Sequence, residues 1–210
     1  GPEIPNLIHE ILRRTNIDVK NKIPVVVRAD SKEIHKSPFV YFTGHQDFTL
    51  TQAEVENLRT YILQGGCIVA NSSLPGRRSR FDVAFRREMA RVIPDHPLEP
   101  IRRNHPVFSS FVKFQGPPEG MNFWREPLEA ITINDRIVVI YNLNDYGDLM
   151  LARLEDGEIK KGLHPEYYWH WEGPRNWQNF RKIYANAGDY ATVDNAYLMN
   201  INILAYVLTR

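Results

Sequence analysis

Residues 38–73, PFVYFTGHQDFTLTQAEVENLRTYILQGGCIVANSS, determine how the rest of the chain is arranged. An apolar run at 39–42 ends in Thr-Gly-His, and a second apolar run at 67–70 ends in Asn-Ser-Ser. The residues between the two runs have the pattern of an amphipathic helix. A strand, a helix and a second strand joined by short links form a βαβ unit, which requires parallel strands and a right-handed crossover.

The helix of this unit has a clear start and a clear end. Thr51 precedes it and Glu54 follows three residues later, which is the pattern of a capping box. Gly65 and Gly66 end the helix, because glycine accepts the left-handed conformation found at helix C-termini. The unit is therefore defined by local signals at both ends of its helix.

The ends of the two strands are the first place to look for a functional site. Ligands of open parallel sheets bind outside the carboxyl ends of the strands. Gly44 and His45 follow the first strand, and Asn71, Ser72 and Ser73 follow the second. We therefore expect these small and polar residues to border any ligand site.

Composition limits the class of protein. The 210 residues are 43% hydrophobic and 24% charged, which suits one soluble α/β domain spanning residues 1–210. The net charge of +1 argues against a dedicated nucleic-acid or membrane-surface protein. No apolar stretch approaches the roughly 20 residues of a membrane helix, so we expect no membrane insertion within this chain. A single cysteine, Cys67, excludes an internal disulfide and a cysteine-based metal cluster.

Apolar patterns outside the βαβ unit predict further elements. Helices are expected over 5–15, 81–93 and 194–208, and strands over 23–27, 98–101 and the hairpin 131–141. The arm at 137–140 is apolar throughout, which favours a central strand. Residues 146–192 contain many aromatic residues but little periodicity.

Several motifs resemble one bacterial family. They are LRxYILxGG at 58–66, FDxAFRRExxRVxP at 81–94, Asn-His-Pro-Val-Phe at 104–108, and the stretches 141–148 and 200–202. Over nearly its whole length the chain resembles domain of unknown function 4159 (DUF4159). That family is placed with the class I glutamine amidotransferase-like folds, which are related to flavodoxin-like sheets. The resemblance thus implies a single three-layer α/β domain with a mostly parallel central sheet, and it implies no settled activity.

The resemblance also bears on localisation. Many relatives carry an N-terminal signal or anchor, so we expect a periplasmic or envelope-associated bacterial protein, with the cytoplasm as the alternative.

The turn at 71–73 is the candidate catalytic position. Amidotransferase relatives hold a catalytic cysteine at this turn, whereas Cys67 lies inside the strand and reads as a small buried hydrophobe. A serine could replace the cysteine if a histidine base lies within reach. The hydrolase hypothesis therefore takes Ser72 or Ser73 as nucleophile, His45 as base and Asp145 as the residue that orients it. In the alternative interpretation, the serines cap the following loop.

A set of polar residues could bind a ligand without catalysis. The candidates are Gly44, His45, Asn71, Asn142, Arg77 and Arg80. Arginines near a helix N-terminus can hold phosphate or carboxylate groups, or they can simply face solvent. The histidines lack metal-binding spacings, and we expect no metal and no cofactor.

Three functions follow from these observations. The first is a non-catalytic ligand- or protein-binding module, because the turn lacks a nucleophilic cysteine. The second is the serine hydrolase described above. The third is carbohydrate binding through the aromatic segment 167–177 together with Trp124, since aromatic rings stack on sugars and are enriched at binding surfaces. A loop packed on the core by its aromatic residues is the alternative for that segment.

Overall fold

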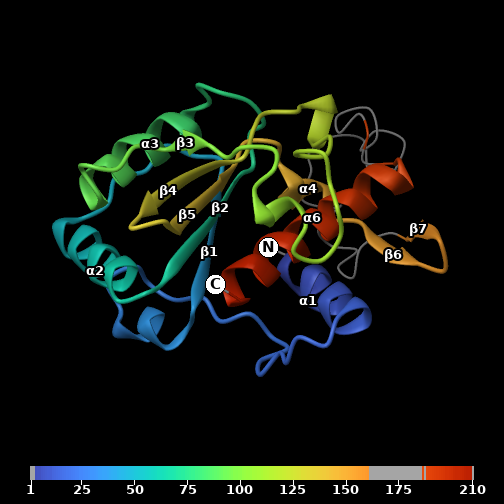
Figure 1. Ribbon diagram of the computed structural model, residues 1–210, viewed down its shortest axis with the longest axis horizontal. Coiled ribbons are helices and arrows are strands. Elements are labelled where there is room, and N and C mark those ends of the chain that lie inside the picture. Colours follow the sequence, from blue (N-terminus) through green and yellow to red (C-terminus); the bar gives the residue numbers. More distant parts are fainter. Residues whose placement is uncertain (1–2, 161–185, 187, 210) are drawn as a thin grey trace.

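The computed structural model describes residues 3–160, 186 and 188–209. A five-stranded sheet with the order β1-β2-β5-β4-β3 lies at its centre (Figure 1). The strands are β1 (Phe39–Gly44), β2 (Cys67–Ser72), β3 (Glu99–Pro100), β4 (Glu129–Ile133) and β5 (Arg136–Asn142). β1, β2 and β5 are parallel neighbours, and β4 is antiparallel to both β5 and β3. Only β4 therefore runs against the other strands, which confirms a mixed α/β fold with a mostly parallel central sheet.

The predicted βαβ unit is present. β1 pairs with β2 in parallel after the intervening helix α2 (Gln52–Leu63). Thr51 accepts a hydrogen bond from the Glu54 backbone N–H, and the Glu54 carboxylate accepts the Thr51 N–H at 2.8 Å. The predicted capping box is thus confirmed in both directions.

Helices cover both faces of the sheet, as Figure 1 shows. α2 and α3 (Arg80–Val92) pack with Ile68 and Ala70 of β2 in one core cluster. Cys67 and Val69 belong to the opposite cluster, with α1 (Glu3–Arg14), α4 (Tyr146–Leu149) and α6 (Tyr190–Thr209). Since successive side chains of a strand point to opposite faces, a strand between two helical layers must be apolar throughout.

The hairpin of β4 and β5 contains an irregularity. Ile131 pairs with Val139, but Thr132 pairs with Ile137, so Val138 is an extra residue on β5. A bulge of this kind changes which face the following side chains reach. Val138 and Val139 consequently lie in the same core cluster although they are adjacent in sequence.

The strand predicted over 23–27 is wrong. These residues form no strand, and Ile23 and Val26 are 79% and 97% exposed. β-branched residues suit a strand only where a neighbouring strand supplies hydrogen bonds and packing. Within the described ranges, β1 pairs only with β2, so no strand edge receives the segment.

The remaining elements are short 3-10 helices, a small hairpin and the last helix. Short 3-10 helices occur at η1 (Lys32–Lys36), η2 (Pro106–Phe108) and η3 (Met121–Phe123), and a small hairpin is formed by β6 (Arg153–Glu155) and β7 (Glu158–Lys160). That hairpin lies in the region without periodicity and was not expected. α6 begins at Tyr190, before the predicted start, because the Asp189 carboxylate accepts the Thr192 N–H at 2.8 Å and acts as a cap. Among the helices that the structure describes, none combines the length and apolarity needed to cross a membrane.

Candidate functional site

An asparagine network joins the carboxyl ends of β2 and β5. Asn142 donates its side-chain amide to Asn71 Oδ1 at 2.6 Å, and the Gly147 N–H also approaches this oxygen, at 3.4 Å. Asn142 Oδ1 in turn accepts from the backbone N–H of Asn144 at 2.9 Å. Asn71 and Asn142 are only 2% and 4% exposed. The structure therefore brings these two predicted ligand residues together, and it uses most of their polar atoms internally.

The segment before β4 covers the end of β5. Met121 donates its N–H to the Asn144 carbonyl at 2.8 Å, and Tyr146 donates its hydroxyl to the Pro118 carbonyl at 2.7 Å. Gly120 lies so close that an added Cβ would stand 2.0 Å from the Asn144 carbonyl oxygen. Contacts with residues 118–121 thus cover the carboxyl end of β5.

Asp145 is buried beside the network. It has a left-handed φ of 52°, and its carboxylate caps α4 by accepting the Asp148 N–H at 3.2 Å. Burial raises the pKa of Asp145 well above its ordinary value, and the nearby charge of Asp148 raises it further. The Tyr41 hydroxyl and Asn71 Nδ2 are also buried here, and neither makes a hydrogen bond of standard geometry in the described part of the chain. Burial also raises the pKa of the Tyr41 hydroxyl well above its ordinary value. The negative charges of Glu3, Asp145 and Asp148 raise it further.

The hypothetical catalytic residues each have other contacts. Ser72 is buried, donates its hydroxyl to the Leu74 carbonyl at 2.7 Å and accepts the Leu74 N–H at 3.3 Å. The Ser73 hydroxyl lies 3.1 Å from the Thr43 hydroxyl. His45 is exposed, and its backbone carbonyl accepts from Arg80 Nε at 2.8 Å. Among the described residues, no hydrogen bond joins His45 to either serine or to Asp145.

Gly44 has a packing role in the structure. An added Cβ would stand 2.8 Å from the buried ring of Phe81. That ring is stacked on Phe85 and also contacts Phe42 and Phe48. The absence of a side chain at Gly44 thus makes room for an aromatic cluster under α3.

The arginines after β2 are engaged with carboxylates. Arg77 donates to Glu129 at 2.7 Å and to Glu126 at 3.1 Å. Arg86 donates to the other Glu129 oxygen at 2.6 Å and to Asp82 at 2.9 Å. Since Glu129 is buried, these guanidinium groups neutralise a charge inside the protein. Arg80 is held by the His45 carbonyl instead.

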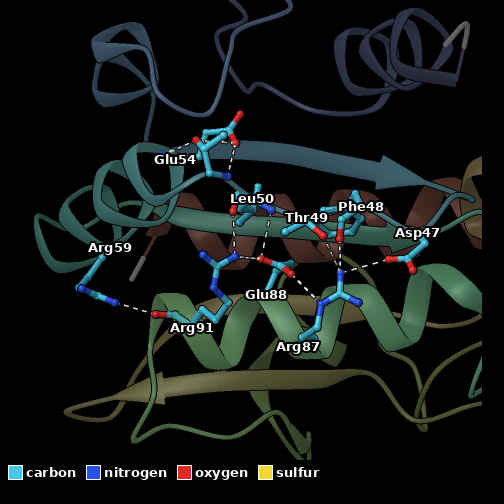
Figure 2. Close-up of polar contacts among 10 residues, drawn as sticks. Asp47, Phe48, Thr49, Leu50, Glu54, Arg59, Arg87, Glu88 and Arg91 are labelled. Atoms are coloured by element: carbon cyan, nitrogen blue, oxygen red, sulfur yellow. Dashed lines mark hydrogen bonds and ion pairs between the residues drawn. The ribbon is translucent and has the colours of Figure 1, made fainter.

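The loop after β1 is bound to α3 around a buried carboxylate (Figure 2). Glu88 accepts from Arg87 Nε at 2.8 Å, from the Leu50 N–H at 3.1 Å, and from Arg91. Arg87 also reaches Asp47 and the Phe48 carbonyl. Burial opposes the ionisation of Glu88, but the hydrogen bonds from Arg87, Leu50 and Arg91 outweigh it and lower its pKa. The loop that follows His45 is therefore fixed to α3.

A groove that sequence reasoning missed lies beside β3. Its volume is about 600 Å³, and its lining includes Arg102, Arg103, Phe114, Pro117 and Arg125. The only available signal was the Arg-Arg pair directly after the predicted strand at 98–101. A second pocket of about 290 Å³ lies at the amino end of β1. It is lined by residues 35–38, Tyr61 and 64–66.

Two further predictions concern aromatic and metal-binding residues. The aromatic segment 167–177 lies outside the described residues. Trp124 is partly exposed, and its ring packs where a side chain at Gly76 would otherwise lie. In the part of the chain that the structure describes, no group of three or more His, Cys, Asp or Glu residues could hold a metal ion.

Fold and site together define a mixed α/β domain in which the carboxyl ends of β2 and β5 are joined by side-chain hydrogen bonds. The chain belongs to the family described as "Domain of unknown function (DUF4159)", whose model matches residues 3–208. A comparison with curated proteins found no match.

Proposed function

We propose that this chain is a non-catalytic binding module, folded as a single amidotransferase-like domain and working in an envelope-associated bacterial assembly. The observation that carries the proposal is the burial and internal hydrogen bonding of the Ser72 hydroxyl. Its hydroxyl is buried and bonded to both backbone groups of Leu74, so it is not presented to a cleft. Cys67 is buried inside β2 and offers no alternative nucleophile.

The contacts of the other polar residues at this edge support the same proposal. Asn71 and Asn142 bond each other, and Asp145 caps α4. These are the roles of residues that stabilise a fold, because buried polar groups must find partners within the protein. Envelope association rests on the signals and anchors of the relatives that the sequence resembles. Fractionation of the native bacterium should place the protein with the periplasm or envelope, and recovery in the cytosol alone would remove that part of the proposal.

A fluorophosphonate probe tests the absence of catalysis. Folded protein should remain unlabelled, as should the Ser72→Ala and Ser73→Ala variants, alongside a serine hydrolase as positive control. Labelling of the native chain that disappears in one serine variant would overturn the proposal in favour of a hydrolase.

The hydrolase alternative depends on one observation. Ser73 is only partly buried at the end of β2, and its hydroxyl bonds Thr43, two residues before the exposed His45. A His45→Ala variant separates the two functions, because a catalytic base is required for labelling and a surface histidine is not.

A further inference from the structure

The groove beside β3 has the volume of a ligand site. Its volume of about 600 Å³ falls within the range of about 300–1,000 Å³ typical of such sites. It lies between the residues that follow β3 and the segment 114–127, at the end of the sheet remote from β1. It is therefore separate from the asparagine network at the ends of β2 and β5.

The groove lining carries three arginines, Arg102, Arg103 and Arg125, and a single carboxylate, Glu119. The Arg102 and Arg103 side chains are exposed and make no hydrogen bond or ion pair within the described ranges. Among the described residues, Arg125 is paired only with Glu119, at 3.4 Å, and its side chain is 68% exposed. By contrast, Arg77 and Arg86 are each bonded to two carboxylates. The groove thus has arginines free to bind an anion from outside.

Part of the groove lining is apolar and rich in proline. Phe114 supplies an aromatic surface, and Pro117, Pro118 and Pro127 line the sides. Proline fixes φ, so such walls lose little conformational freedom when a ligand binds. The side chains of Gln115 and Asn195 add polar groups to the lining.

We propose that this groove binds an acidic, extended peptide segment of a partner protein; the inference rests on the binding function proposed above. Arginine forks bind carboxylates in bidentate geometry, and the apolar walls accept the aliphatic or aromatic side chains between them. The net charge of +1 disfavours nucleic acid, because binding the phosphate backbone depends on extended positive surfaces. A free phosphate would use the arginines alone and leave the apolar residues of the groove without a contact.

Fluorescence anisotropy with two labelled peptides tests the proposal. One peptide alternates Glu and Asp with Leu and Phe, and the other has Gln and Asn in place of the acids. The acidic peptide should bind in the micromolar range and bind more weakly as salt rises. The neutral peptide should bind at least about tenfold more weakly, and the Arg102→Ala/Arg103→Ala double variant should lose a similar factor.

A matched variant and a folding check make the result decisive. Arg28→Ala removes an exposed arginine, paired with Asp30, that is no part of the groove, and it should leave the peptide affinity unchanged. Circular dichroism should be identical for all variants, since Arg102 and Arg103 make no internal side-chain bonds among the described residues.

Several outcomes would overturn the inference. These are no binding, equal binding of both peptides, equal loss in Arg28→Ala, and displacement of the acidic peptide by inorganic phosphate or by anionic lipid vesicles. Self-association that disappears in the double variant would make a second copy the occupant instead. Each leaves the fluorophosphonate result untouched, so failure of this inference is distinguishable from failure of the proposed function.

Discussion

Asn142 and Asn71 share a hydrogen bond of 2.6 Å that links the last residues of two parallel strands in a buried setting. Replacing Asn142 with Ala removes the donor to Asn71 and the acceptor for Asn144. We expect a loss of about 2–3 kcal/mol in the free energy of unfolding, because buried groups lose their partners. Urea denaturation measures this. The exposed Lys22→Ala should change stability little, and an equally small effect at Asn142 would contradict the structural role.

Arg86 and Arg77 should differ in their effects although both bind Glu129. Arg86→Ala removes bonds to Glu129 and Asp82, both buried, so stability should fall by about 3–5 kcal/mol. Arg77 is 42% exposed, and its removal leaves Arg86 in place, so Arg77→Ala should cost distinctly less. Thermal unfolding of both variants gives the comparison. A larger loss in Arg77→Ala would show that Glu129 is held chiefly by Arg77.

Gly44→Ala should destabilise the protein through Phe81. The new methyl group would stand 2.8 Å from a ring that is packed among other aromatic side chains. We expect a loss of about 1–3 kcal/mol, as for other overpacked cores. The double variant Gly44→Ala/Phe81→Leu should lose less than the sum of the single variants in a mutant cycle. Strict additivity would indicate that Gly44 matters for another reason.

Asp145→Asn should alter the dependence of stability on pH. Burial, and then the charge of Asp148, raise the pKa of Asp145 in the folded protein. In the unfolded chain an aspartate has a pKa of about 3.9. The folded state therefore binds the proton more tightly, and its stability is lost as the pH rises from about 4 through the raised pKa. Asparagine keeps the cap and tolerates the left-handed backbone, so the variant should be at least as stable at pH 8 and vary less with pH.

Urea unfolding of Asp145→Asn at pH 5 and pH 8 measures this effect. Asp156→Asn is the matched control, because Asp156 also has a positive φ, of 51°, but is exposed in a turn. It should leave the pH dependence unchanged. A native-like pH dependence in Asp145→Asn would show that Asp145 contributes little to proton binding.

The parts of the fold that could be predicted are those with local causes. The capping box at Thr51 and the glycines after α2 act within a few residues, and they locate the βαβ unit correctly. The strand over 23–27 fails for the opposite reason. A strand depends on a neighbouring strand, and the sequence does not reveal that residues 23–27 fail to pair with β1.

The candidate site shows the same division. The positions of Asn71 and Asn142 at strand ends follow from the βαβ pattern and the central apolar arm, but their mutual hydrogen bond depends on strand order. The partners of Arg77 lie far along the chain, at Glu126 and Glu129. Which arginines are neutralised internally, and which remain free at the groove, is a tertiary property without a local signature.

The attachment of the loop after β1 to α3 has a dynamic consequence. Glu88, Arg87 and Arg91 hold the backbone at Phe48 and Leu50 from one side of the helix (Figure 2). Amides of an untethered surface loop exchange with solvent by local fraying, whereas a loop fixed to a buried carboxylate must open together with its support. The Leu50 amide should accordingly exchange on the slow timescale of α3, and Glu88→Gln should accelerate both together. This part of the molecule then behaves as one cooperative unit, with no hinge between the sheet and its covering helix.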